Sequence, residues 1–239
     1  MATVVARLPT ARSDRNFFTG MAVFFIVISA AGFWQSLYLA PWFGTKPLSP
    51  IMHLHGVVMT AWVLFFLLQT AFVRNARVEA HRRWGMVGLL LAGAVGATSL
   101  ATVMATLGAG RLDKSVPVEI FLVFPIGLSL MFWLLVGCAA YWVRDAPTHK
   151  RLMVLATLAT MATPIARLRL PFLPPAALGG NIAVIALILP LVLHDLASFR
   201  RVHPATLWGG GFIAAMLPLR LLVAHTDAWK GFVGWLGAT

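Results

Sequence analysis

The sequence predicts an all-α, polytopic integral membrane bundle of about seven transmembrane helices with a cytoplasmic N-terminus. Of its 239 residues, 60% are hydrophobic and 11% are charged, and the mean hydropathy is +0.86. Soluble domains carry about 25% charged residues, so this composition does not fit a water-soluble core. A transmembrane helix needs about 20 apolar residues, and seven of them use about 140, close to the apolar content of the chain. The composition therefore excludes a soluble enzyme, a nucleic-acid-binding domain and a disordered protein.

The apolar runs divide the chain into a cytoplasmic N-terminal tail over 1–16, a single transmembrane domain over 17–224 and a short C-terminal tail over 225–239. The first uncharged run, from Phe17 to Thr45, is far longer than the apolar core of a signal peptide, so we expect it to be retained. Seven spans are predicted, at about 17–40, 51–73, 84–107, 118–143, 152–164, 176–193 and 204–224. The fifth is short because Pro164 ends it, and every later loop changes sides if it does not cross.

The positive charges supply the predicted orientation. The chain has 19 Lys and Arg against 7 Asp and Glu, a formal net charge of +12. In a soluble protein this excess would suggest nucleic acid, but cytoplasmic loops of membrane proteins retain Lys and Arg. With the N-terminus inside, 12 of the 19 cations fall on inner segments: Arg7, Arg12, Arg15, Arg74, Arg77, Arg82, Arg83, Arg144, Lys150, Arg151, Arg200 and Arg201. We therefore predict a multi-pass protein of the cell inner membrane with no nucleic-acid partner.

Histidine is the candidate ligand for any metal, because the only cysteine, Cys138, lies within an apolar run. The seven histidines fall near the two predicted membrane faces: His53, His55, His81, His149, His194, His203 and His225. On the inner side, one histidine comes at or just before the start of each odd-numbered span from the third on, and another closes the sixth. This recurrence at aligned helix ends marks a candidate site.

Two interpretations of the inner histidines stay open. In the first, imidazoles from different helices coordinate haem b or a metal ion, with His81, His149, His194 and His203 as ligands. Neighbouring cations would then pair with haem propionates: Arg82, Arg83, Lys150 and Arg151. In the second interpretation, the histidines are interfacial residues that hydrogen-bond loop carbonyls.

The outer histidines His53 and His55 open the second span and are further candidates for cofactor binding. Side chains two residues apart on a helix point about 200° from each other, so we expect only one of the two to face the bundle. Gly56 leaves room there for a close neighbour or a flat cofactor. An anionic group is expected near the outer cations and the last histidine, Arg167, Arg169, Arg220 and His225. A quinone or lipid-headgroup site is the alternative, beside the aromatic residues Trp34, Tyr38, Trp42 and Trp62.

The cations at the inner helix starts oppose the helix macrodipole at about 0.3 to 1 kcal/mol each, so their position needs a cause. Anionic headgroups attract each Lys or Arg by about 1 kcal/mol, and a bound phosphate or carboxylate would use the free helix amides as well. Anionic lipids at the cytoplasmic face are therefore expected partners. No Gly-rich phosphate loop, serine nucleophile motif or His-Glu-x-x-His motif occurs in the chain, and no catalytic residue is predicted.

Four stretches resemble a family of bacterial multi-pass membrane proteins of uncharacterised function: His53-Leu54-His55-Gly56, His81-Arg82-Arg83-Trp84-Gly85, His149-Lys150-Arg151-Leu152-Met153 and His203-Pro204-Ala205-Thr206-Leu207-Trp208-Gly209-Gly210. The resemblance covers about 50 to 235 and implies a membrane bundle without adding a reaction. The second and third stretches are also similar to helix starts in small membrane proteins of haem handling, cytochrome oxidase assembly and b-type cytochromes. The chain departs from typical b-type cytochromes in lacking two well-buried histidines about four turns apart on one helix.

The leading functional hypothesis is thus a histidine-lined interfacial site that binds haem or a metal for membrane redox chemistry or cofactor handling, with a quinone or another redox partner. The alternative is a non-enzymatic, lipid-interacting or small-molecule transport protein, in which the inner basic residues bind anionic headgroups.

Overall fold

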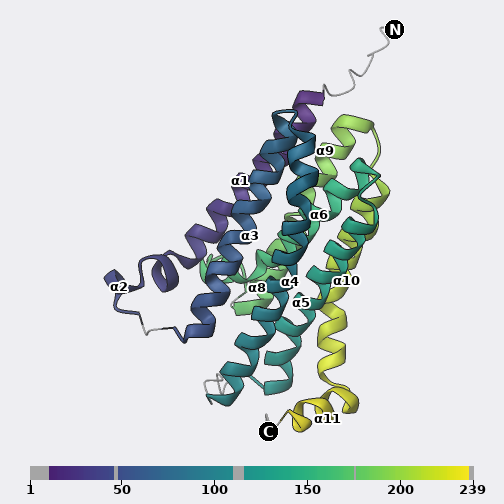
Figure 1. The fold of residues 1–239 in the computed structure, drawn as a ribbon. Helices are drawn as coiled ribbons and strands as arrows, with labels where there is room; N and C mark the ends of the chain where they lie inside the picture. The colour runs from purple at the N-terminus through teal and green to yellow at the C-terminus, as the bar shows by residue number, and fades with distance from the viewer. Residues whose placement is uncertain (1–10, 46–47, 110–115, 175, 237–239) are drawn as a thin grey trace.

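The computed structural model of the protein describes residues 11–45, 48–109, 116–174 and 176–236. Within these ranges the secondary structure is helical and contains no strand. Most of the predicted N-terminal tail, residues 1–10, lies outside the described residues, as do Lys46, Arg111, Lys114 and 237–239. The helices pack side by side into one elongated bundle, in which the start of α1 and the final helix α11 lie at opposite ends (Figure 1).

The helices follow the predicted apolar runs closely. In chain order they are α1 (Ala11–Phe33), the π-helical turn η1 (Trp34–Tyr38), α2 (Ala40–Phe43), α3 (Pro50–Arg74), α4 (Val78–Gly108), α5 (Val118–Tyr141), α6 (Ala146–Thr160), α7 (Ala162–Arg167), α8 (Ala176–Ala186), α9 (Leu189–Phe199), α10 (Pro204–Ala224) and α11 (Asp227–Trp235). Proline lies in the first turn of α3, α6, α9 and α10, where the missing N–H has no helical partner to lose.

The predicted count of seven apolar spans is corrected to six, and the chain also passes through the bundle once in the two short helices α6 and α7. Among the described residues, six helical segments are long and apolar enough to cross a membrane: Arg12–Tyr38, Pro50–Arg74, Val78–Gly108, Val118–Tyr141, Leu178–Phe199 and Pro204–Ala224. The predicted fifth span is divided at Met161 into α6 and α7. Pro164 explains the break, because it has no N–H to donate to the Thr160 carbonyl and its ring crowds that carbonyl.

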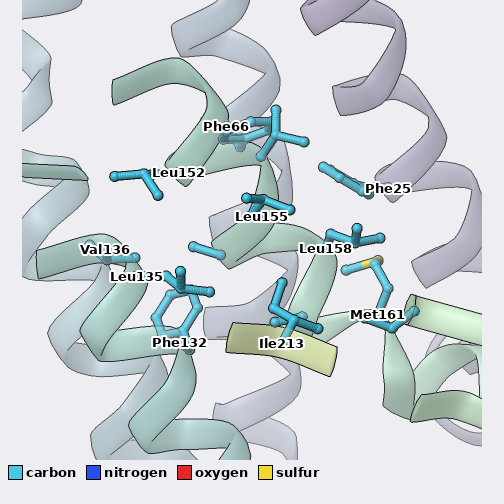
Figure 2. Packing of buried hydrophobic residues seen from close by; sticks show 14 of the residues in the cluster. Phe25, Phe66, Phe132, Leu135, Val136, Leu152, Leu155, Leu158, Met161 and Ile213 are labelled. Atoms are coloured by element: carbon cyan, nitrogen blue, oxygen red, sulfur yellow. The ribbon is translucent and has the colours of Figure 1, made fainter. Parts of the chain in front are cut away.

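Most of the divided segment lies inside the bundle, in contact with other helices. Helix α6 packs against α1, α5 and α10, and α7 packs against α1 and α8. From Leu152 to Ala159, every side chain of α6 except that of Met153 is fully buried. Figure 2 shows Leu155 and Leu158 facing Phe25 and Ile213 across the core. A helix enclosed by other helices does not have to match lipid, so α6 tolerates threonines and a charged first turn.

Three basic loops gather at one end of the bundle, which we call the basic end: residues 75–77, 142–145 and 200–203, together with the start of α1. Contacts between side chains join these segments. Lys150 of α6 forms an ion pair with Asp14 of α1, and the rings of His81 and His149 join α4 to α6. At the far end, Trp229 of α11 donates its indole N–H to the Glu119 carbonyl at 3.0 Å. The grouping of the loops agrees with the predicted charge asymmetry.

Candidate functional site

His81 and His149 are the two inner histidines that the fold brings together. His81 lies in the first turn of α4 and His149 in the first turn of α6, and their ring centroids are 6.2 Å apart with an interplanar angle of 76°. The His149 Nδ1 atom lies 2.8 Å from the Ala139 carbonyl oxygen. Because a carbonyl only accepts hydrogen bonds, Nδ1 carries the proton, and Nε2 of the neutral ring keeps a free lone pair. Metal-binding histidines have this arrangement.

Buried polar atoms without partners occur in this pair and in Gln69, whose backbone contacts the His81 ring. The His81 Nδ1 atom and both amide atoms of the Gln69 side chain are buried and have no hydrogen-bond partner among the described residues. The backbone carbonyl of Gln69 lies beside the His81 ring. Leaving a buried polar group unpaired costs about 1–3 kcal/mol, so such groups need an explanation. A ligand held between α3, α4 and α6 would supply the missing partners.

His194 lies apart from this pair, in a local network with α1. Its Nε2 atom is 3.2 Å from Asp14 Oδ1, and its ring stacks on Phe17 with centroids 3.9 Å apart and an interplanar angle of 3°. The other oxygen of Asp14 accepts a 2.5 Å hydrogen bond from Lys150 Nζ. Asp14 therefore holds two of the predicted site residues, His194 and Lys150, in a structural contact between helices.

His203 also has a local role, as the N-cap of α10. Its Nδ1 atom accepts a hydrogen bond from the Ala205 N–H at 3.1 Å. An N-cap acceptor satisfies one of the free amides at a helix start. Burial, assisted by the positive charge of Arg151, lowers the pKa of His203, which favours the neutral ring that the cap requires. The capping bond explains why a histidine stands at this helix start.

Arg151 is engaged in a buried ion pair and is not available to another anion. Its Nε and Nη2 atoms donate to Asp195 Oδ1 at 2.9 and 2.5 Å, and its Nη1 donates to the Pro147 carbonyl at 2.8 Å. Arg82 and Arg83, by contrast, are exposed, and they join five other exposed arginines at the basic end: Arg74, Arg77, Arg144, Arg200 and Arg201. We call these seven residues the arginine ring.

The two outer histidines diverge, as expected from their spacing. Helix α3 begins at Pro50, so both lie within it. His53 is exposed beside the Ser49 carbonyl, whereas His55 is half-buried with its Nδ1 3.0 Å from Thr98 Oγ1 of α4. The space beside Gly56 is filled by Leu37, whose Cδ2 would lie 2.8 Å from an added Cβ. A side chain therefore occupies the room in which a flat cofactor was expected.

The predicted outer group of cations is also dispersed. Arg167 is exposed and lies over the Phe33 ring, with its guanidinium carbon 4.8 Å from the ring centroid. Arg169 and His225 are exposed, and the Nδ1 atom of His225 contacts the Leu221 carbonyl. Arg220 instead points into the protein, where it is 3% exposed.

Sequence reasoning placed Arg220 with surface cations, but the structure buries it between α5, α8 and α10. Its Nη2 donates to Asn181 Oδ1 at 2.6 Å, its Nε to the Met216 carbonyl at 2.9 Å and its Nη1 to the Phe124 carbonyl at 3.3 Å. The guanidinium carbon lies 5.1 Å from the Phe124 ring centroid. No carboxylate forms an ion pair with it among the described residues. The isolated Asn181 in an apolar run was the one sequence signal for such a contact.

The structure thus separates the four predicted metal ligands into one pair, His81 with His149, and two residues with structural contacts. Among the described residues, no group of three or more His, Cys, Asp or Glu side chains is placed to hold a metal ion. A site at the pair therefore needs an amide or an external ligand to complete it. No protein-family model, curated protein or solved structure matches the chain, so the predicted family resemblance stays a prediction.

Proposed function

We propose that the protein is a multi-pass inner-membrane protein that binds one first-row transition-metal ion between His81 and His149, for membrane redox chemistry or cofactor handling. The observation that carries the proposal is the pairing of an imidazole oriented by a backbone carbonyl with a second imidazole that has one buried nitrogen without a partner. His149 is held through Nδ1 by the Ala139 carbonyl, and the buried Nδ1 of His81 has no partner.

The separation of the two rings is slightly longer than one shared ion requires. With metal–nitrogen bonds of about 2.0 Å, two imidazoles on one metal have their centroids about 5 to 6 Å apart. The observed separation is 6.2 Å. Imidazole ligands suit zinc, copper, iron and nickel, and the buried, unpartnered amide oxygen of Gln69, whose backbone contacts the His81 ring, is a candidate for a third ligand. A substrate or a redox partner such as a quinone would take a remaining position.

A single ion fits this arrangement more readily than a haem macrocycle does. Two hollows lie beside the loop 142–145 at the basic end, and neither His81 nor His149 lines them. The cations expected to pair with haem propionates are either engaged or exposed. Arg151 is bound to Asp195, and Lys150 is bound to Asp14. Haem b would require these contacts to rearrange, and an absorption spectrum separates the two cofactors.

Metal analysis of the purified protein tests the proposal. We expect about one equivalent of iron, copper or zinc, no Soret band, and loss of the metal in both His81→Gln and His149→Gln. His53→Gln is the matched control, because this exposed histidine contacts only the Ser49 carbonyl. A wild-type protein without stoichiometric metal overturns the proposal. A Soret band would show that the bound cofactor is haem and not a single ion.

A second candidate function, binding of anionic lipid headgroups, is favoured by the exposed arginine ring. Each cation near a membrane surface gains about 1 kcal/mol from anionic lipid, so several together give substantial binding. Replacing Arg83, Arg200 and Arg201 together with Gln is expected to reduce the anionic lipid that copurifies with the protein. The His81→Gln and His149→Gln variants should keep that lipid, so the two functions can be tested separately.

A further inference from the structure

Two shallow hollows flank the loop 142–145 at the basic end. One has a volume of about 500 Å³ and is lined by Trp142, Asp145, Thr148, His203, Pro204, Ala205 and Trp208. The other, also of about 500 Å³, is lined by Tyr141, Trp142, Val143, Arg144 and Asp145. Small-molecule sites commonly span about 300 to 1,000 Å³. Trp142 and Asp145 border both hollows, so they are the central residues of this surface.

Asp145 supplies the first hollow with an uncompensated negative charge. It is the N-cap residue of α6, but its side chain makes no capping hydrogen bond. Among the described residues its carboxylate forms no ion pair or hydrogen bond. The two neighbouring cations of α6 are already committed, Lys150 to Asp14 and Arg151 to Asp195. In a chain of net charge +12, this hollow is thus lined by a carboxylate and by no Lys or Arg.

The other lining residues do not cancel this charge. Burial and the charges of Arg151 and Lys150 lower the pKa of His203 more than the carboxylates of Asp195 and Asp145 raise it, which favours a neutral ring there. Thr148 is buried and uncharged, and Pro204 and Ala205 are apolar. No cationic side chain lines the first hollow.

Two indole side chains complete the hollow. Trp142 is 46% exposed and Trp208 is 42% exposed, so both keep free surface beside the carboxylate. Tryptophan is the aromatic side chain that attracts cations most strongly, and quaternary ammonium groups are recognised by such aromatic surfaces. Anchoring at the membrane interface accounts for exposed tryptophans, but it does not account for an unpaired carboxylate between them.

We propose that this hollow binds an organic ammonium group, with Asp145 as the counter-charge and Trp142 and Trp208 as the aromatic walls. The ammonium belongs either to a phospholipid headgroup or to a free small molecule. The exposed Arg144, Arg200 and Arg201 lie on the two loops that border the hollow, where they would pair with the phosphate of a zwitterionic headgroup. This site is separate from the His81–His149 pair.

The test measures stabilisation of the purified protein by tetramethylammonium chloride against sodium chloride at the same ionic strength. A ligand that binds only the folded state raises the unfolding temperature in proportion to its occupancy. We expect tetramethylammonium to raise it and sodium not to, and we expect Asp145→Asn to weaken binding at least tenfold. Asn keeps the size of the side chain, and no hydrogen bond of the carboxylate is lost.

Asp227→Asn and Trp42→Leu are matched controls, because both residues are exposed and lie outside the basic end. They should bind tetramethylammonium like the wild type, whereas Trp208→Leu should not. Equal stabilisation by the two salts, or unchanged binding in Asp145→Asn, overturns the proposal. Asp145→Asn could itself alter the unfolding temperature before ligand is added. In that case Asp145→Glu is measured instead, because it keeps the negative charge and should bind tetramethylammonium.

Counting the lipids that stay bound to the protein distinguishes the two sources of the ammonium group. In nanodiscs that contain phosphatidylcholine and phosphatidylglycerol, native mass spectrometry counts the lipids retained by each variant. Loss of retained phosphatidylcholine in Asp145→Asn, with phosphatidylglycerol unchanged, assigns the site to a lipid headgroup. Unchanged retention of both lipids, together with weaker tetramethylammonium binding, assigns it to a free organic ammonium.

Discussion

Arg151 and Asp195 form a fully buried ion pair that joins α6 to α9, with both side chains 0% exposed. The second oxygen of Asp195 accepts hydrogen bonds from the Thr206 hydroxyl at 2.6 Å and from the His203 backbone N–H at 3.0 Å. One carboxylate therefore connects α6, α9 and the start of α10. Removing one member of such a pair leaves a buried charge without compensation, which costs far more than the pair itself contributes.

Asp195→Asn is expected to destabilise the bundle by about 3–5 kcal/mol, because it leaves the Arg151 charge buried and unpaired. The free energy of unfolding in mixed detergent micelles measures this. Asp227→Asn is the control, because Asp227 is fully exposed and its ion pair with Lys230 is long, at 3.9 Å. This substitution should change the free energy of unfolding by less than about 0.5 kcal/mol. Similar losses in the two variants would contradict the structural role of the pair.

His203 is expected to make the stability of the fold depend on pH. Its pKa in the folded protein lies below the ordinary value of 6.5, because of burial and then the charge of Arg151. The unfolded chain therefore binds more protons as pH falls below 6.5, so the contribution of the neutral ring is present above that pH and is lost at lower pH.

His203→Asn provides the comparison, because Asn also caps a helix but does not titrate. Between pH 7.5 and pH 5.5, the wild-type protein should lose more free energy of unfolding than the variant does. Equal losses would show that other groups carry the pH dependence.

The positions of most helices in this fold could be predicted, because a helix in contact with lipid needs a long run of apolar residues. Helices α1, α3, α4, α5 and α10 fall where hydropathy predicts them, and the divergence of His53 from His55 follows from helix geometry alone. The predicted fifth span is instead divided into α6 and α7, and the neighbours of α6 are other helices. Its sequence carries polar residues that protein contacts satisfy, so hydropathy could not distinguish a buried crossing from a lipid-facing one.

The candidate site was only partly predictable, since a histidine at a helix start has several possible partners. The recurrence of histidine at inner helix ends did identify His81 and His149, which come from helices 68 positions apart in the chain. It could not show that His203 caps its own helix or that His194 contacts Asp14. The cap of His203 is a local contact, but histidine is not one of the usual N-cap residues. The contact of His194 with Asp14 depends on how α9 packs beside α1, which no local pattern records.

Gly127 of α5 is expected to be required by the buried Arg220. A Cβ added at Gly127 would lie 2.5 Å from the Arg220 Cδ atom, in the middle of a side chain fixed by three hydrogen bonds. Gly127→Ala should therefore destabilise the bundle by about 1–3 kcal/mol through overpacking. Gly137→Ala, on the same helix, has nothing within 4 Å of the added Cβ and should be neutral or stabilising.

A double variant identifies the cause of this loss. Arg220→Met should relieve the clash, so that Gly127→Ala costs less in its presence than in the wild-type protein. Unfolding in mixed micelles measures each arm of the cycle. Strict additivity of the two substitutions would mean that Gly127 is required for a reason other than its contact with Arg220.

The arrangement of the loops also makes a prediction about membrane sidedness. Loops 142–145 and 200–203 lie at the basic end, and α11 lies at the opposite end (Figure 1). Helix α11 carries Lys230, whose side chain is exposed. Cationic loops are retained in the cytoplasm, so the basic end should face inward and α11 outward.

Cysteines introduced at 144, 200 and 230 in a Cys138→Ser background test this orientation, because Cys138 is the only native thiol. In intact cells with a permeable outer layer, a membrane-impermeant maleimide should label Lys230→Cys alone, and Arg144→Cys and Arg200→Cys should react only after the inner membrane is opened. Labelling of 144 and 230 from the same side would mean that the chain does not pass from one face to the other between α5 and α11.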